Sequence, residues 1–382
     1  MRPAVVLLVL ASLGTGCKEP PAAKPPEPFS APIVQPPVEQ GEIWGPQDEH
    51  NTRVVRRIFH DALVAETGDD SLMRRDAHPK HHACVRARLE VDTKRLRPDY
   101  RHGLFAQDGE YEAWVRFSNG DSDRHKDDDE PNFRGMAIKV MKVPYRSYLS
   151  EVGLERDNPV HDLVLLNSPT FFIGDTTEYA EFMRAVAKGG LALAGFSMRH
   201  GENIKIIQKS RKMKVGNVLD VDYHSATPYK LGSTSMRMQM HSCTDVAHKR
   251  PRRPSPNFLA ERLEASLAQG EHCFVFYLQP NEDPERNPIE DPLRSWDLET
   301  SPLVEVGRLT VLQQTGARAP DQQAMCEHLS FNPWRAPSAN RPMGQANRVR
   351  LEVYTNQAKL RHDHNEAEEP RPLTLEIEPA TR

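Results

Sequence analysis

Alternating apolar and polar positions predict strands through the central part of the chain. Val85, Ala87, Leu89 and Val91 alternate with charged side chains, which is the two-residue period of a strand with one buried face. Other short segments have a strand-like composition: 113–118, 134–143, 162–166, 236–242, 273–279 and 304–311. So many short strands joined by turns predict a largely antiparallel barrel or sandwich.

A helical period predicts helices before and after these strands. Apolar positions from Val54 to Leu63 recur at helical spacing within residues 51–66. Asp175 is a typical N-cap for a helix that runs through Tyr179 and Met183. The same period is present at 257–268, 321–329 and 346–361. We therefore predict an α+β fold, with one folded domain over residues 47–380.

Composition supports a globular domain and excludes one class of partner. The chain has 382 residues, of which 38% are hydrophobic, enough for a substantial core. Its 50 basic and 54 acidic side chains give a net charge of −4. This near-balance gives no reason to propose nucleic acid as a partner.

The first 17 residues have the pattern of an export signal. Arg2 precedes the apolar run Val5–Leu13, which is too short to span a bilayer, since a spanning helix needs roughly 20 residues. The run ends at Cys17 after small residues, and this resembles a bacterial lipoprotein signal, although Gly14 stands where such signals usually have Leu. The alternative is a secretory signal cleaved near Gly16. We predict that residues 1–17 are a lipoprotein-type signal and that Cys17 is lipidated.

Residues 18–46 are rich in proline, alanine and glutamate. A segment of this composition behaves as an extended spacer, so we predict a tether between a lipid anchor and the folded domain. Four cysteines follow it, and none has the spacing of a metal site: Cys84, Cys243, Cys273 and Cys326. They could pair in three ways. We expect buried free thiols.

The helix predicted near the C-terminus carries the most informative polar residues. Arg350, Tyr354 and Arg361 share a narrow stripe at about 100° per residue. An arginine four residues before a tyrosine can donate to the phenolic oxygen, and a phenolate suits ferric iron. Without other signals, the same stripe is typical of a surface helix.

Catalases carry this arrangement: Arg, Tyr four residues later and Arg seven beyond that, on a helix after a Phe-x-Pro turn. The chain resembles them here, because Phe331-Asn332-Pro333 is such a turn and both intervals between the three residues match. The resemblance implies that Tyr354 is the proximal ligand of haem b. It also implies that Arg350 tunes this ligand and that Arg361 pairs with a haem propionate.

Four further segments resemble catalase motifs in the same order along the chain: Arg75-Asp76-Ala77-His78, Val115-Arg116-Phe117-Ser118, Arg134-Gly135-Met136-Ala137-Ile138-Lys139 and Asn167-Ser168-Pro169-Thr170-Phe171-Phe172-Ile173. The resemblance implies an antiparallel β-barrel core with inserted and C-terminal helices. It makes His78 the distal catalytic histidine and Ser118 the group that orients it. It also implies that Arg75 and Arg116 bind propionates and that Asn167 and Phe172 line the distal pocket.

Some positions depart from the catalase pattern. Catalases have two asparagines before Thr-Pro and use the first in catalysis, whereas this chain has Leu166 there, so Asn167 would have to take the role. Tyr179 stands where catalases stack a phenylalanine on the haem. A metal cluster of His78 with His81 and His82 is an alternative, but Pro79 leaves little room for the helix it needs.

Three functions follow from these features. The first is a haem peroxidase or catalase that consumes hydrogen peroxide or organic hydroperoxides at the bacterial cell envelope, anchored to the outer membrane and facing the periplasm. The second is a fatty-acid hydroperoxide isomerase of the allene oxide synthase type, with a lipid hydroperoxide as substrate. The third is a non-enzymatic haem-binding envelope protein, which Leu166 favours. The sequence has no independent motif for NADPH and no signal for an oligomeric state.

Overall fold

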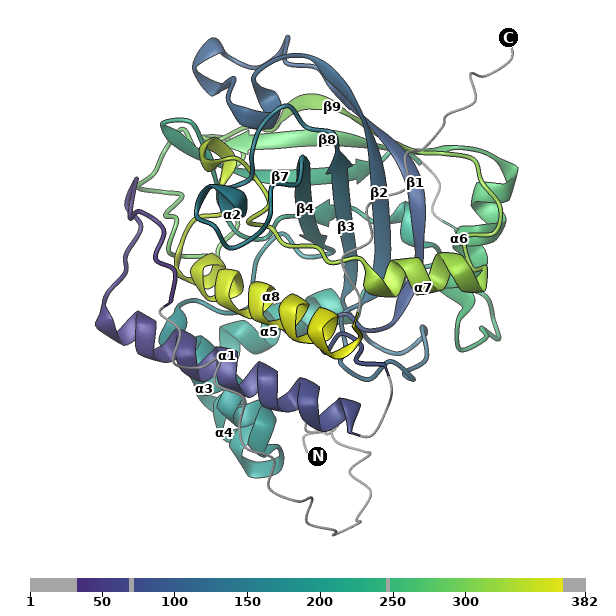
Figure 1. The fold of residues 1–382 in the computed structure, drawn as a ribbon, viewed down its shortest axis with the longest axis horizontal. Coiled ribbons are helices and arrows are strands. Elements are labelled where there is room, and N and C mark those ends of the chain that lie inside the picture. The colour runs from purple at the N-terminus through teal and green to yellow at the C-terminus, as the bar shows by residue number, and fades with distance from the viewer. Residues whose placement is uncertain (1–32, 69–71, 245–247, 367–382) are drawn as a thin grey trace.

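The core is a closed antiparallel β-barrel (Figure 1). The computed structural model describes residues 33–68, 72–244 and 248–366. Within these ranges one nine-stranded sheet has the order β5-β4-β3-β2-β1-β9-β8-β7-β6, and β5 also pairs with β7. That pairing closes all strands except β6 into a barrel. The strands are β1 His81–Val91, β2 Gly109–Asn119, β3 Arg134–Met141, β4 Val160–Leu166, β5 Tyr223–His224, β6 Tyr229–Leu231, β7 Thr234–Ser242, β8 His272–Pro280 and β9 Val304–Val311.

The inside of the barrel is filled with apolar side chains. On β2, Val115 and Phe117 belong to this core and are fully buried. Successive side chains of a strand point to opposite faces, so Arg116 and Ser118 point outward. The predicted site residues of β2 therefore lie on the outer face of the barrel, where helices cover them.

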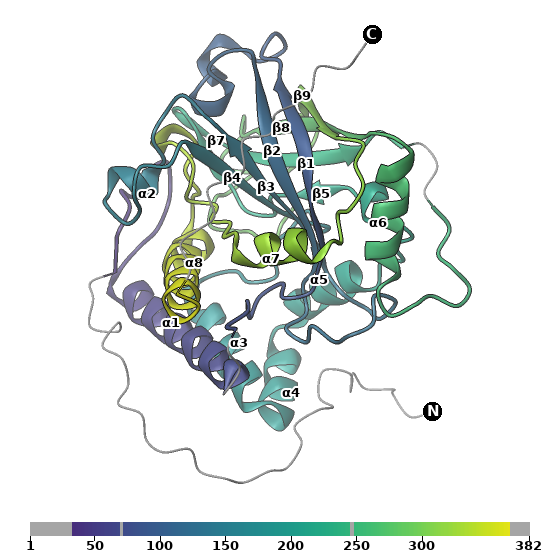
Figure 2. The same cartoon turned by 45° about the vertical axis from the view of Figure 1, so that its right-hand side comes forward.

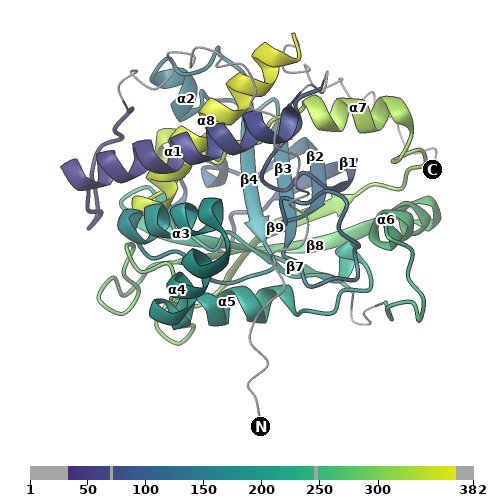
Figure 3. The same cartoon turned by 90° about the horizontal axis from the view of Figure 1, so that it is seen from below.

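Helices pack around the barrel. They are α1 Pro46–Thr67, α2 Tyr148–Glu151, α3 Thr176–Lys188, α4 Gly190–Arg199, α5 Gly201–Arg211, α6 Phe258–Gln269, α7 Pro320–His328 and α8 Gln345–His364. α6 and α7 contact β1, and α1 contacts both α3 and α8. Figure 2 shows α7 crossing the lower part of the barrel near β1. Figure 3 shows α1 lying across α8 on one side and beside α3 on the other.

The observed elements confirm the predicted fold class and most predicted segments. β9 has the predicted bounds, and Asp175 caps α3 by accepting a hydrogen bond from the Glu178 amide at 2.8 Å. Three helices, α2, α4 and α5, and the two shortest strands, β5 and β6, were not predicted. Strands of two or three residues are too short to show an alternating pattern.

Residues 18–32 of the predicted tether lie outside the described residues. From Ile33 onward the tether packs on the folded domain. Arg348 donates to the carbonyl oxygens of Pro36 and Pro37 at 2.6 and 2.7 Å. The buried Glu42 carboxylate lies 2.7 Å from Arg341 and 3.0 Å from Arg348. This segment therefore holds the N-terminal half of α8 from outside. The predicted signal and Cys17 lie outside the described residues.

All four remaining cysteines form disulfides, so the expectation of free thiols was wrong. Cys84 pairs with Cys326 across 242 positions of sequence, and Cys243 pairs with Cys273. The Cα atoms are 5.4 Å apart in each pair. The sequence could not show this, because only the fold brings α7 beside β1. None of the helices in the described ranges is long and apolar enough to cross a membrane.

Candidate active site

His78 lies in the loop between α1 and β1 and is held by two residues of β2. Its Nδ1 is 3.0 Å from the Ser118 hydroxyl oxygen, and its carbonyl oxygen accepts a hydrogen bond from Arg116 at 2.7 Å. Its backbone has a φ of 57°, a left-handed conformation that is uncommon for a residue other than glycine. Such strain persists only where surrounding contacts enforce it. Ser118 thus contacts His78 as predicted, whereas Arg116, which was predicted to bind a propionate, binds the His78 backbone.

Two glycines make room for the imidazole ring. A Cβ atom on Gly135 would lie 2.7 Å from both Cε1 and Nδ1 of His78, and one on Gly120 would lie 3.3 Å from Cε1. Gly135 pairs with Ser118 across β2 and β3. This explains the glycine of the Arg-Gly motif in β3, because a residue with a Cβ atom would not leave space for the His78 ring beside Ser118.

The imidazole of His78 is neutral across the ordinary pH range. Burial, together with the positive charges of Arg116, Arg350 and Arg75, lowers its pKa to about 3. A neutral imidazole whose Nδ1 is bound to a hydroxyl can exchange a proton at Nε2.

On α8, Arg350 contacts Tyr354 as the helical spacing predicted. Its Nη2 is 3.4 Å from the phenolic oxygen, and its Nη1 donates to Asn347 Oδ1 at 2.9 Å and Thr227 Oγ1 at 3.3 Å. Burial opposes the charged guanidinium, but Tyr354 and Tyr229 outweigh it and raise the pKa of Arg350 above its ordinary value. A permanent positive charge therefore lies beside the phenolic oxygen of Tyr354, which is half-buried.

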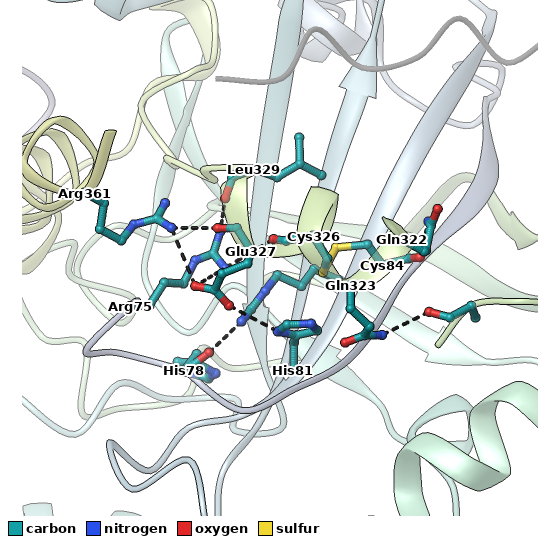
Figure 4. Close-up of a disulfide and its surroundings, with 12 residues drawn as sticks. Arg75, His78, His81, Cys84, Gln322, Gln323, Cys326, Glu327, Leu329 and Arg361 are labelled. Atoms are coloured by element: carbon teal, nitrogen blue, oxygen red, sulfur yellow. Dashed lines mark hydrogen bonds and ion pairs between the residues drawn. A yellow bond between two sulfur atoms is a disulfide. The ribbon is translucent and has the colours of Figure 1, made fainter. Parts of the chain in front are cut away.

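Two of the three arginines predicted to bind propionates lie beside one carboxylate, Glu327 of α7. The Oε1 atom of Glu327 is 3.8 Å from Arg75 and 3.7 Å from Arg361. Its Oε2 is 3.6 Å from His81, whose pKa is lowered to about 3 by burial and by Arg116. Figure 4 shows Arg75, Arg361 and His81 directed at Glu327.

The charged groups of this cluster shift one another's pKa values. Burial, Arg75 and Arg361 hold the pKa of Arg116 well below its ordinary value, although Glu327 acts in the opposite direction. Burial opposes the Glu327 carboxylate, but the arginines still lower its pKa. Glu327 was not predicted as a site residue, because only the fold brings the end of α7 beside Arg75 and Arg361.

Aromatic side chains form the wall predicted for the distal side. Phe172 is half-buried and contacts Phe171, Phe133 and Phe182, with ring centroids 4.9, 5.7 and 5.5 Å away respectively. Tyr179 lies edge-on to Phe171 at 6.2 Å. Such a surface excludes water and suits an apolar ring or chain.

Asn167 has a structural task in addition to its predicted one. Its Oδ1 accepts from the Arg134 amide at 2.8 Å, and its Nδ2 donates to the Ser210 carbonyl at 3.0 Å. It therefore joins the start of β3 to α5. Leu166 pairs with Gly135, the residue against the His78 ring. The catalytic role of Asn167 stays a prediction, and its amide is engaged elsewhere.

Two further observations bear on other sites. No group of three or more histidine, cysteine or acidic side chains in the described part of the chain could hold a metal ion. A small pocket lies beside the start of α8, lined by residues that include Thr227, Ile289 and Met343. None of the predicted haem residues lines this pocket.

The comparison with solved structures shows the fold. No family model and no curated protein matches the chain. Similar solved structures include a fungal catalase, a bacterial catalase and catalase A from Saccharomyces cerevisiae. The TM-scores are 0.60, 0.60 and 0.58, and the sequence identities are 16%, 16% and 17%.

These matches cover 87%, 94% and 87% of this chain and 66%, 70% and 71% of the respective catalases. The chain thus spans about two thirds of their length. Sequence identity this low shows the fold and not the activity. The chain therefore has a catalase-like fold, an antiparallel β-barrel with helices packed on its outer face.

Proposed function

We propose that the protein binds haem b through Tyr354 and acts as a peroxidase on hydrogen peroxide or organic hydroperoxides. The observation that carries this proposal is the arrangement of the arginine cluster. Arg75 and Arg361 lie 3.8 and 3.7 Å from Glu327, and Arg116 lies on the outer face of β2 beside His78. Guanidinium groups bind carboxylates through charge-assisted hydrogen bonds. The two propionates of haem are carboxylates that this cluster would bind.

The other groups also suit haem. Tyr354 provides a phenolic oxygen beside a charged guanidinium, and tyrosine is a known ligand of ferric haem. When bound, haem supplies the redox chemistry of peroxide cleavage. The aromatic wall of Phe171 and Phe172 offers an apolar surface to the macrocycle or the substrate.

The residues of the chain would then handle the proton of the peroxide. Neutral His78 accepts it at Nε2 from one oxygen and returns it to the other, while Ser118 holds the ring through Nδ1. Transfer of this kind contributes typically 10²–10⁴-fold to a rate. The aromatic wall excludes water from the reacting atoms.

Leu166 favours peroxidase over catalase turnover. It stands at the position of the usual catalytic asparagine, and the amide of Asn167 is engaged with Arg134 and Ser210. The apolar side chain adds no hydrogen-bond donor beside a second peroxide molecule, but it accommodates an organic hydroperoxide. This supports a second candidate function, an isomerase that acts on fatty-acid hydroperoxides.

We also propose that the protein works outside the cytoplasm, at the cell envelope, attached through Cys17. Two disulfides support this location, because disulfides persist in oxidising compartments. A Cys17→Ser variant tests the anchor. We expect it to move from the membrane fraction to the soluble fraction of the envelope, and a variant that stays with the membrane would contradict lipidation.

The optical spectrum of the purified ferric protein tests the central proposal. We expect a Soret band that changes when peroxide is added. Tyr354→Phe should lose haem or change the spectrum, whereas Tyr111→Phe, which alters a phenol on β2 outside this site, should not. Protein without a Soret band would refute haem binding.

The activity assay then offers hydrogen peroxide and a polyunsaturated fatty-acid hydroperoxide separately, with a reducing donor present. Oxidised donor identifies a peroxidase, oxygen release identifies a catalase, and a rearranged product without donor oxidation identifies the isomerase. His78→Ala with full haem content and unchanged turnover would instead indicate a non-enzymatic haem-binding protein.

A further inference from the structure

The C-terminal turn of α7 orients two of the three arginines in the cluster. Arg75 donates to the carbonyl oxygens of Cys326, at 3.4 Å, and of Leu329. Arg361 donates to the carbonyl oxygen of Glu327 at 2.7 Å. Figure 4 shows both guanidinium groups meeting this short stretch of backbone.

This contact has a simple physical basis. The last carbonyl groups of a helix have no partner within the helix, and they carry the negative end of its dipole. Guanidinium groups satisfy them and gain favourable electrostatics. Arg75 and Arg361 come from segments far apart in sequence, the loop before β1 and the end of α8. The end of α7 is therefore their common support.

α7 itself depends on its attachment to the barrel. It has nine residues, and helices this short are not stable in isolation. Cys326 joins it covalently to Cys84 of β1, and Gln322 donates to the Cys84 carbonyl at 2.9 Å. Both cysteines are completely buried, within a small apolar cluster that includes Trp114 and Leu329. The carbonyl oxygen of Cys326 accepts the hydrogen bond from Arg75, and Cys326 directly precedes Glu327 in the sequence.

We propose that the Cys84–Cys326 disulfide is a positioning element for haem propionates, which makes haem retention depend on oxidation of these cysteines. The inference rests on the proposed haem function. Oxidation removes two protons and two electrons from the thiols, and a protein disulfide that takes part in thiol–disulfide exchange accepts them as its own two thiols. The oxidised pair locks the end of α7, and α7 in turn holds Arg75, Arg361 and Glu327 where the propionates bind.

The second disulfide provides a matched control. Cys243 and Cys273 lie next to each other at the ends of β7 and β8, where the Cys243 amide donates to the Cys273 carbonyl at 3.0 Å. The side chain that contacts their sulfur atoms is Arg308 of β9. This contact involves Arg308 and none of the arginines Arg75, Arg116 and Arg361.

The experiment compares Cys84→Ser/Cys326→Ser with Cys243→Ser/Cys273→Ser in the full haem-loaded chain. The readout is the rate of haem transfer to excess apomyoglobin. We expect the first variant to lose haem about 10–100-fold faster than the unaltered protein, the range typical for loss of groups that orient metal or cofactor ligands. The control should change the rate less than about twofold, because it leaves those groups in place. Equal rates in both variants would overturn the proposal.

A second measurement separates positioning from general loss of stability. Arg75→Lys is introduced into the unaltered protein and into each disulfide variant. If the disulfide acts through Arg75, the lysine substitution should accelerate haem loss less in the Cys84→Ser/Cys326→Ser background, while its effect in the control stays full. Additive effects in both backgrounds would refute the positioning role.

Cys84→Ala/Cys326→Val serves if the serine variant does not fold, because it removes the cross-link but keeps apolar groups in the cluster. The same acceleration of haem loss is expected. The outcomes are distinct: unaltered protein without a Soret band refutes the haem function and this inference with it. A normal Soret band with unchanged haem-transfer rates refutes this inference alone.

Discussion

Gly135→Ala is a direct test of the histidine geometry. The added Cβ would lie 2.7 Å from Cε1 and Nδ1 of His78 and 2.9 Å from the Ser118 hydroxyl oxygen. Favourable contacts between such atoms begin near 3.5 Å, so the ring must retreat by roughly 0.8 Å. The hydrogen bond between His78 and Ser118, now 3.0 Å, would then exceed its useful range.

The expected magnitudes follow from this displacement. Overpacking costs about 1–3 kcal/mol of unfolding free energy, and loss of the hydrogen bond adds about 0.5–1.5 kcal/mol. A misplacement of about 1 Å at a catalytic group can cost on the order of 10²-fold in rate. We therefore expect the second-order rate constant with peroxide to fall about 100-fold while haem content is unchanged, because Tyr354 lies on α8.

Stopped-flow measurement of the Soret change on mixing with peroxide gives this rate constant, and chemical unfolding gives the stability. Gly195→Ala in α4 is the control, since its Cβ would meet nothing closer than Arg199 at 3.6 Å. That change should leave the rate unaltered and stabilise the helix by about 0.5–1 kcal/mol. A Gly135→Ala protein that reacts at the unaltered rate would refute the proton-transfer role assigned to His78.

Three other predictions concern the distal pocket, the acid stability and the N-terminal segment. Leu166→Asn should raise oxygen release from hydrogen peroxide, on the order of tenfold or more, because a hydrogen-bond donor returns beside His78; an oxygen electrode measures this, and no gain would contradict it. The unfolding free energy should be at its maximum above pH 6.5 and should fall as the pH falls toward 4. In this range the unfolded chain binds more protons than the folded chain, because burial lowers the pKa values of four histidines to about 3 or 4 in the folded state: His78, His81, His82 and His161. Each of these histidines adds about 1.4 kcal/mol per pH unit to the loss of unfolding free energy. Equal unfolding free energies from urea titrations at pH 7.5 and 5.0 would contradict this prediction. Glu42→Gln should cost roughly 3–5 kcal/mol because it leaves two buried arginines without their carboxylate, whereas Glu110→Gln, at an exposed ion pair, should cost less than about 1 kcal/mol in the same thermal unfolding assay.

The local structure could be predicted from the sequence because it depends on short-range periodicity. β9 was predicted with its observed bounds, and the cap at Asp175 follows from a side chain three residues from the amide that it binds. The contact between Arg350 and Tyr354 likewise follows from the spacing of four residues on one helix. The order of motifs along the chain also indicated that His78 and Ser118 meet, which the structure shows at 3.0 Å.

Only the tertiary structure decided the contacts between segments that are distant in sequence. Cys84 and Cys326 are 242 positions apart, and no spacing rule connects them. Glu327 becomes part of the site because the fold brings the end of α7 beside Arg75 of the loop before β1 and Arg361 of α8. Asn167 was predicted to line the distal pocket. Its amide binds partners on strand β3 and helix α5, and α5 was not predicted. Periodicity determines which elements form and which face of each is apolar, whereas the closure of the barrel by β5 and β7 determines which polar groups share one buried space.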